Sequence, residues 1–569
     1  MYKVIAMVLL VAGALAAPAT THGQKSAHKR APKTEQKDGA TRFEISFPAA
    51  AHDGPITGRV YVMIAKTNDP EPRLQVGRFG GPLFGRDVEQ LAAGTPAVID
   101  ASDLGTPVEN LNDVPAGDYY VQGFINVYSE FKRADGHVLW MHDDQWEGQH
   151  WTTSPGNLKS AVQKVHIDPK GAPQTIKLVA SGVLPPIEIP ADTEWVKRFK
   201  FQSPLLTKFW GRPIYIGATI LLPKDYALGT TRYPVIYEQT HFSLGNPYGF
   251  KTVPPTDEEV KRYGPYAKRG YDLYQAWNSD HFPRMIVVTF QHPNPYFDDA
   301  YAVNSVNVGP YGDAIMQELI PEIQKRFRTI EEPYARVLEG GSTGGWEALA
   351  LQIYHPEFFG GAWGYCPDPV TFTNVEGINI YKDTNAFYKQ YDWRREPTVN
   401  SFFTDERVIL TSEQRNHMEL VNGTHGRSGE QIDIWSAVFG PVGKDGYFEP
   451  LFNKSTGEIN PDVAQYWKDH YDLLEYMKKN WSTLGPQLVD KIRIYVGTMD
   501  TYQLNVAVRE MQEWMKTTET PHYEGFFEYG VGEPHCYTGE QTTPERVTEI
   551  AEFIAGKRPY KEAAPWWQR

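Results

Sequence analysis

The order of hydrophobic and polar positions changes its character once along the chain, near residue 190. Before this point, apolar and polar residues alternate in short runs between turn residues, as in β-strands that have one buried face. No helical pattern of any length interrupts them. We therefore predict an antiparallel β-sandwich domain over residues 41–190, which ends in the proline-rich linker Leu184–Pro190. Its clearest predicted strands are Phe43–Phe47, Gly58–Ile64, Tyr119–Val127 and Gln174–Val179.

From about Glu194, strand and helix patterns alternate. Met285–Phe290 is a continuous apolar run, typical of a strand buried on both faces, and Gly312–Arg328 has the apolar stripe of a helix. This alternation predicts an α/β fold over residues 191–560, with a mainly parallel sheet covered by helices on both faces. The other predicted strands are Ile214–Leu222, Tyr233–Glu238, Arg336–Glu339, Gly361–Tyr365 and Lys491–Val496, and the other predicted helices are Asn505–Lys516 and Pro544–Ala555.

Residues 369–489 form an interval that is far longer than an ordinary connection between neighbouring strands. The interval contains a predicted helix, Pro461–Asn480, and many aromatic residues. We predict that it is a cap, or lid, inserted over the site. A surface excursion with no role at the site is the alternative.

The stretch Val337–Trp346 contains the pattern Gly-x-Ser-x-Gly, formed by Gly340, Ser342 and Gly344. Apolar residues precede it and the helix formers Glu347–Gln352 follow it, which is the strand-turn-helix context of a nucleophile elbow. Glycine is needed at these points because a Cβ atom would strike the neighbouring strand or helix. Since the bare pattern also occurs in plain turns, the flanking segments carry the prediction that Ser342 is a nucleophile.

A serine hydroxyl is a weak nucleophile that needs a histidine base, and the histidine needs a carboxylate to orient it. In hydrolases of this architecture the order along the chain is Ser, acid, His. Asp500 follows the strand Lys491–Val496, and His535 lies in a Gly- and Pro-containing loop before the last helix. We predict a triad of Ser342, His535 and Asp500. The competing candidates are His522, His292 and His281 for the base, and Glu533 and Asp490 for the acid.

An oxyanion hole should take one backbone N–H from Thr343, directly after the nucleophile, and another from the loop after the strand Tyr233–Glu238. This loop begins Gln239-Thr240-His241-Phe242. We predict the N–H of Phe242 as the second donor, with His241 as its neighbour.

The N-terminus has the pattern of a secretory signal peptide over residues 1–19, with a short basic start, an apolar stretch and the small residues around Ala16. An uncleaved membrane anchor is the alternative, but it needs a longer apolar run. We expect cleavage near Ala16 or Ala19 and export, to a secreted or periplasmic location. Residues 20–40 are polar and basic, and we predict a disordered linker there.

Composition limits the partners. The formal net charge of −14 argues against nucleic acid as a partner, because nucleic acid requires a basic face. No apolar run beyond the N-terminus is long enough to span a bilayer.

The loop Met141–Trp151 gathers His, Asp and Glu side chains, but their spacing fits no familiar metal-ligand pattern, so a hydrogen-bonded polar loop is the favoured interpretation. The two cysteines, Cys366 and Cys536, are a candidate disulfide in an exported protein, with two buried free thiols as the alternative.

Several segments between residues 233 and 361 resemble secreted esterases of the α/β-hydrolase superfamily. This group includes esterase D-like enzymes, feruloyl and acetylxylan esterases, and enterochelin esterase with its N-terminal β-sandwich. The resemblance covers about residues 195–560. The segments that carry it are Tyr233–Tyr237, Asn307–Asp313, Glu318–Glu322, Gly340–Trp346 and His355–Gly361.

The resemblance implies that Ser342, Asp500 and His535 are the nucleophile, acid and base. One departure is that the usual His-Gly after the oxyanion strand is His241-Phe242 here. The resemblance also implies that Cys366 and Cys536 lie at the same rim. There a disulfide would fix the histidine loop, as a bridge does in some feruloyl esterases.

We therefore predict a secreted serine esterase that acts through an acyl-enzyme, without metal or organic cofactor, on small-molecule or carbohydrate-linked esters, including aromatic acyl esters. A serine peptidase of the prolyl-oligopeptidase type is one alternative, although about 150 residues of N-terminal strands are too few for the β-propeller of that group. A catalytically silent hydrolase fold that binds a glycan or a protein partner is the other. The sequence leaves the oligomeric state open.

Overall fold

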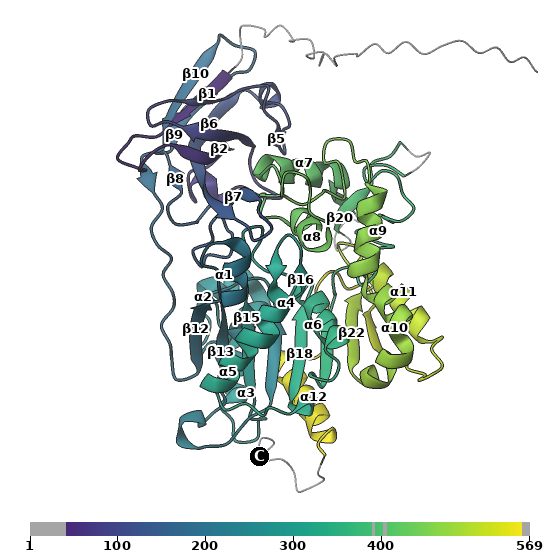
Figure 1. Ribbon diagram of the computed structural model, residues 1–569. Helices are drawn as coiled ribbons and strands as arrows, with labels where there is room; N and C mark the ends of the chain where they lie inside the picture. Colours follow the sequence, from purple (N-terminus) through teal and green to yellow (C-terminus); the bar gives the residue numbers. More distant parts are fainter. Residues whose placement is uncertain (1–40, 390–392, 402–406, 560–569) are drawn as a thin grey trace, which may run out of the picture. The chain divides into compact units, whose positions relative to one another are not determined.

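The computed structural model describes residues 41–389, 393–401 and 407–559 (Figure 1). The predicted signal peptide and linker, residues 1–19 and 20–40, lie outside the described residues and stay predictions. The described residues all belong to one compact unit. The strands of this unit fall into two groups, one within residues 41–183 and the other within residues 196–530.

The first group builds two sheets that share a hydrophobic core. Phe43 and Ile45 of the smaller sheet pack with Val60, Val62 and Ile125 of the larger one. All strand pairs in the two sheets are antiparallel except β1 with β10, which is parallel. The smaller sheet has the order β10 (Gln174–Val179), β1 (Thr41–Ser46), β4 (Ala97–Ile99). The larger has the order β11 (Gly182–Val183), β8 (Leu158–Lys159), β6 (Gly117–Lys132), β2 (Ile56–Ala65), β3 (Leu83–Leu91), β5 (Gly105–Thr106), with β7 (Val138–His142) and β9 (Gln163–Ile167) also paired to β6.

Strand β2 is buried along its whole length. Its residues alternate between two faces, so Val60 and Val62 face the shared core while Tyr61 and Met63 face the other way. On that second side they pack with Val421, which belongs to the long interval after residue 368. The strands of the first group are therefore in direct contact with the predicted cap.

Eight strands of the second group form one sheet, the mainly parallel sheet of the predicted α/β fold. The first two pairs are antiparallel and the others are parallel. Helices lie against this sheet, and α6 (Thr343–Tyr354) packs on its central strands (Figure 1). The order is β12 (Val196–Gln202), β13 (Tyr215–Leu221), β15 (Ile286–Gln291), β14 (Val235–Gln239), β18 (Arg336–Gly341), β19 (Gly361–Tyr365), β22 (Ile492–Gly497), β23 (Phe526–Gly530).

Two predicted helices differ in the structure. The segment Gly312–Arg328 forms α4 (Tyr311–Ala314), a π-helical turn at Ile315–Leu319, and α5 (Ile320–Arg326). The irregular turn precedes Pro321, whose nitrogen has no hydrogen to donate to the helix. The other helices outside the long interval are α1 (Pro204–Trp210), α2 (Asp257–Tyr263), α3 (Arg269–Trp277), α11 (Leu504–Met515) and α12 (Thr543–Gly556).

The prediction of a single helix over Pro461–Asn480 is wrong, because two helices occupy this stretch, α9 (Pro461–His470) and α10 (Leu473–Leu488). Asp472 has extended backbone angles, and its carboxylate accepts from the N–H of Glu475, so it begins a new helix. The remaining elements of the interval are β20 (Pro397–Ser401), β21 (Arg407–Thr411), α7 (Ser412–Asn422) and α8 (Gln431–Phe439).

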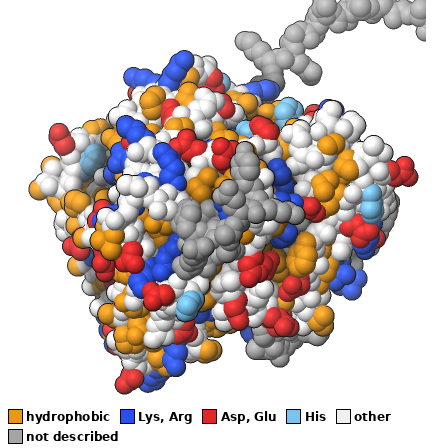
Figure 2. All heavy atoms as spheres, turned by 90° about the horizontal axis from the view of Figure 1, so that it is seen from below, with side chains coloured by type: hydrophobic (Ala, Val, Ile, Leu, Met, Phe, Trp, Pro, Cys, Tyr) orange, Lys and Arg blue, Asp and Glu red, His pale blue; other side chains and the backbone are white. Residues whose placement is uncertain are grey.

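On the face drawn in Figure 2, acidic and basic side chains are interspersed with apolar ones. Among the described residues, helices with the length and apolarity needed to cross a bilayer are not found.

Candidate active site

Ser342 stands at the sharp turn between β18 and α6. Its backbone angles, φ 57° and ψ −122°, are strained for a residue with a side chain. A Cβ atom on Gly344 would lie 2.0 Å from the carbonyl oxygen of Gln239, and one on Gly340 would lie 2.3 Å from the carbonyl oxygen of Gly344. Only glycine therefore lets α6 start so close to the neighbouring strand, and this places the Ser342 side chain above the carboxyl end of β18.

The structure brings Ser342, His535 and Asp500 into one hydrogen-bonded chain. Oγ of Ser342 is 3.0 Å from Nε2 of His535, and Nδ1 of the same ring is 2.8 Å from Oδ2 of Asp500. The backbone N–H groups of Tyr502 and Leu504 donate to the other carboxylate oxygen of Asp500, at 2.9 and 3.3 Å. These bonds hold the buried carboxylate in the orientation that the imidazole needs.

The pKa of His535 is raised above its usual value. Burial works against the charged imidazolium, but hydrogen bonds to Asp500 and Cys536 and the negative charges of these groups outweigh it. Asp500 is therefore suited to stabilise the imidazolium that forms when the ring takes a proton from Ser342.

The competing residues lie elsewhere. His522 is exposed and contacts Glu524, and Asp490 pairs with Lys557 at the surface. His281 lines a different cavity, beside α12. His292 is buried, and its Nδ1 accepts from the N–H of Ala300. The carbonyl of Glu533 accepts from the N–H of Met499, but its side chain is exposed.

The two predicted oxyanion residues flank the nucleophile. Thr343 begins α6, and its side chain is fully buried. Phe242 lines the same cavity as Ser342, and its ring packs edge-on against Trp146, with centroids 5.1 Å apart. A Cβ atom on Gly148 would lie 2.5 Å from this ring, so the loop after β7 packs directly against the side chain of Phe242.

That loop is the polar segment Met141–Trp151. Nε2 of His142 is 2.7 Å from Oε1 of Glu147, and the carboxylate of Asp144 accepts from the N–H groups of Trp146 and Gln149. Asp144 and Glu147 therefore bond within the loop, whereas Asp143 pairs with Arg212 outside it.

Asp368 is a residue of the site that sequence reasoning missed. Its Oδ1 is 3.4 Å from Oγ of Ser342, and its Oδ2 accepts from Tyr301, Thr343, Gln431 and Trp435. Burial raises the pKa of this carboxyl group, against the effect of these donors. Its place just after β19, at the carboxyl end of a parallel strand, is a signal that could have identified it.

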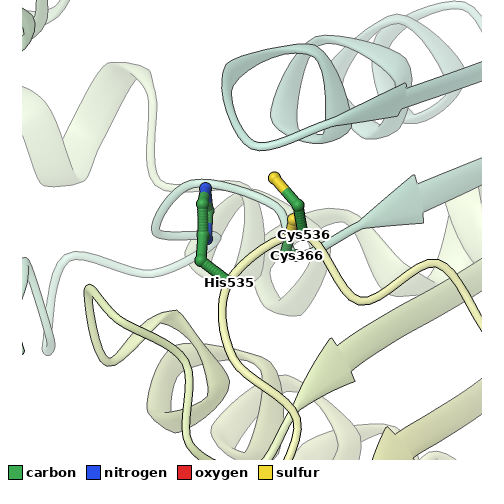
Figure 3. A group of neighbouring side chains, drawn as sticks. All are labelled: Cys366, His535 and Cys536. Atoms are coloured by element: carbon green, nitrogen blue, oxygen red, sulfur yellow. The ribbon is translucent and has the colours of Figure 1, made fainter. Parts of the chain in front are cut away.

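The predicted disulfide is not formed. Cys366 and Cys536 are free, and their sulfur atoms lie within 4.8 Å of one another and of a ring nitrogen of His535 (Figure 3). A disulfide requires an S–S separation of about 2.05 Å. Burial raises the pKa of the Cys366 thiol, whereas the hydrogen bond from Cys366 lowers the pKa of Cys536. The prediction that both cysteines lie beside the histidine loop is confirmed.

A cavity of about 540 Å³ opens over Ser342. Its lining comes from segments far apart in the chain. Arg78 and His150 lie in loops between the N-terminal strands, His241 and Phe242 in the loop after β14, and Arg415 in the long interval. A larger cavity of about 860 Å³ lies among residues 420–461 and does not include the triad. The chemistry therefore belongs to the smaller cavity.

Residues 214–418 match the family described as "Putative esterase". The resemblance to esterases that the sequence suggested is thereby confirmed. The esterase match includes Ser342 and ends before Asp500 and His535, so the geometry alone adds the acid and the base to the site.

Comparison with curated proteins finds no match for this chain. Among solved structures it is similar to a ferulic acid esterase, with 13% identity and a TM-score of 0.35 over 63% of this chain and 98% of the other. An S-formylglutathione hydrolase from Agrobacterium tumefaciens gives 12% identity and a TM-score of 0.31, over 64% and 95% of the two chains. A ferulic acid esterase from Anaeromyces mucronatus gives 12% and 0.27, over 64% and 92%.

Proposed function

We propose that this protein is a serine hydrolase that cleaves carboxylic esters. The observation that carries the proposal is the hydrogen-bonded chain from Ser342 through His535 to Asp500, at the floor of a cavity. Together with the esterase match over residues 214–418, this chain supports ester hydrolysis by nucleophilic catalysis.

In the proposed reaction, Oγ of Ser342 attacks the ester carbonyl while its proton moves to Nε2 of His535. The N–H groups of Thr343 and Phe242 stabilise the resulting oxyanion. The tetrahedral intermediate expels the alkoxide, which leaves as the alcohol with the proton from His535. Water, deprotonated by His535, then attacks the acyl-enzyme, and the carboxylic acid and free Ser342 are released.

The finer parts of the proposal concern architecture and substrate. Residues 41–190 act as a β-sandwich domain and residues 369–489 as a cap, since both contribute side chains to the cavity wall. Phe242, Phe297, Trp435 and Tyr502 line the cavity, which supports an aromatic ring or a sugar as part of the ester. Export to a secreted or periplasmic location rests on residues 1–19.

The decisive experiment compares purified wild type with Ser342→Ala on p-nitrophenyl acetate. We expect kcat/KM to fall by about 10⁴-fold or more in the variant, because the attacking group is gone. Ser455→Ala, on an exposed loop, is the control for the effect of removing a serine hydroxyl, and thermal unfolding checks that both variants fold.

The same preparation separates the alternatives. Cleavage of proline-containing peptides in preference to esters would indicate the serine peptidase, and the absence of turnover in wild type on any ester would indicate the catalytically silent fold. Equal activity of wild type and Ser342→Ala would contradict the proposed nucleophile.

A further inference from the structure

Arg78 is a cation of the active-site cavity that comes from outside the catalytic sheet. It follows the short 3₁₀ turn Pro72–Leu74 and precedes β3, in the N-terminal part of the chain. It nevertheless lines the same cavity as Ser342 and His535. A side chain from the N-terminal part of the chain therefore lies at the catalytic centre.

The position of Arg78 is fixed by Tyr502. One guanidinium N–H donates to the hydroxyl of Tyr502, and the guanidinium carbon is 5.3 Å from the centre of that ring. The ring of Tyr502 in turn meets the ring of His535 edge-on, with centroids 4.7 Å apart. Arg78 therefore lies on the histidine side of the cavity. Because His535 returns the proton to the departing alkoxide, this is the side that receives the alcohol part of an ester.

The other charges of the cavity have partners. Arg415 forms a buried ion pair with Glu376, and each side chain is only 4% exposed. Nδ1 of His241 is 3.1 Å from carboxylate oxygens of both Asp298 and Asp299. Asp368 accepts several hydrogen bonds, as described above.

Glu430 is the remaining carboxyl group of the lining, and it accepts from the amide of Asn422 at 3.1 Å. Burial and the neighbouring Glu419 raise its pKa to about 7, so it is an incomplete counter-charge for Arg78. Within the part of the chain that the structure describes, no carboxylate forms an ion pair with Arg78, and its one side-chain hydrogen bond goes to the hydroxyl of Tyr502.

A guanidinium placed in this way fits one planar anion. Its remaining N–H groups form a fork that matches the two oxygens of a carboxylate. A polyanion such as a phosphate ester would need further permanent cations, whereas Arg78 is the one arginine or lysine without an ion pair among the described residues of the lining. The neighbouring rings of Tyr502 and Trp435 give the carbon skeleton of such a ligand an apolar surface.

We infer that Arg78 binds a carboxylate carried by the alcohol part of the ester, and that the natural substrate is an ester of a hydroxy acid. The inference rests on the proposed function, and it gives the N-terminal strands a direct role in substrate selection.

The test uses matched pairs of acetate esters. 3-Acetoxybenzoate and 4-acetoxybenzoate carry the carboxylate on the leaving group, and the corresponding acetoxybenzamides replace it with a neutral group of similar size.

Wild type should hydrolyse the benzoates with higher kcat/KM than the benzamides. Arg78→Gln should lower this ratio by about 10-fold or more, mainly through KM for the benzoates. Arg78→Lys should recover part of the ratio. Use of the ratio cancels any general effect of the substitution on Tyr502 and His535.

Arg73→Gln is the matched control, because Arg73 lies in the same segment, pairs with Glu71 and does not line the cavity. It should leave the ratio as in wild type. Raising NaCl from 0.05 to 0.5 M should reduce the wild-type preference, which tests the inference even if the Arg78 variants fold poorly.

Equal ratios in wild type and Arg78→Gln, or a wild-type preference for the benzamides, would overturn the inference while leaving the proposed function intact. If wild type hydrolyses none of the four esters or p-nitrophenyl acetate, the proposed function fails. Binding of 3-hydroxybenzoate by calorimetry, weakened in Arg78→Gln and unchanged in Arg73→Gln, would then still support the carboxylate site, and equal binding in all three proteins would refute it.

Discussion

His535 has two sulfur atoms beside it (Figure 3), in addition to the carboxylate of Asp500. Cys536 follows it in the chain, and its lowered pKa, due first to the hydrogen bond from Cys366 and then to His535 itself, favours the thiolate. A thiolate next to an imidazole stabilises the protonated ring. The cysteines therefore influence the base of the triad although neither takes part in the reaction.

The pH profile of ester hydrolysis should show this influence. Because protonated His535 cannot accept the proton of Ser342, and its pKa is raised, kcat/KM should increase with pH through that pKa. Cys536→Ser removes a negative neighbour, lowers the pKa of His535 and should move this rise by about one pH unit toward acid. The measurement is kcat/KM for p-nitrophenyl acetate from pH 5 to 10. A superimposable profile in the variant would show that Cys536 remains a neutral thiol.

At the scale of elements, two central strands of the eight-stranded sheet carry buried carboxyl groups. Glu339 of β18 stands opposite Glu238 of β14 in the parallel register, and burial raises the pKa of each carboxyl group to about 7. Tyr248 and Tyr365 donate hydrogen bonds to Glu339. A hydrogen bond donated by Tyr365 favours the ionised carboxylate, but burial outweighs it and favours the protonated group.

This pair should make the stability of the sheet fall as pH rises. Above the pKa of an unfolded Glu, near 4.5, the unfolded chain ionises while the folded chain resists, so stability is lost between about pH 4.5 and 7. Glu339→Gln removes one of these groups and should raise the free energy of unfolding at pH 8 by up to about 3 kcal/mol, with a much smaller change at pH 5. Denaturant unfolding at both pH values measures this. The same change at both would mean that Glu339 is not the titrating group.

At the scale of the whole molecule, the N-terminal strands contact helix α7, which contains the cavity residue Arg415. Arg59 of β2 donates to the carbonyl oxygens of Leu420 and Val421, at the last turn of α7, at 3.1 and 2.9 Å. It also pairs with Asp87 of β3 at 2.7 Å, and Arg427 approaches the same carboxylate. A cation at the carboxyl end of a helix satisfies carbonyls that have no partner inside the helix.

Arg59→Ala should therefore loosen α7 as well as destabilise the fold. We expect a loss of about 2–4 kcal/mol in the free energy of unfolding, because buried carbonyl groups and Asp87 each lose a charged partner. Amide hydrogen exchange should become faster in α7 than in α6. Arg86→Ala removes a partly exposed arginine that pairs with Asp103 on the same sheet, and it should cost less than about 1 kcal/mol. Equal effects of the two substitutions would refute the link between β2 and α7.

The sequence by itself determined the features that depend on short stretches of chain. The glycines around Ser342, the alternation of strands and helices, and the positions of Asp500 and His535 after their strands follow from local sterics and hydrophobic period. Since the carboxyl ends of parallel strands meet at one edge, chain order was enough to predict which three residues would come together. The π turn before Pro321 and the break at Asp472 were missed because two good helical patterns adjoin there without a glycine between them.

Only the tertiary structure decided what surrounds that triad. Arg78 and Gly148 reach the cavity from loops far away in the chain, and only the packing places an oxygen of Asp368 beside Ser342. Likewise, proximity of the two cysteines could be inferred, but whether their sulfur atoms are bonded depends on distances of a few ångströms. Such contacts arise from the packing of separate sheets and helices, and no local pattern of hydrophobic and polar residues encodes them.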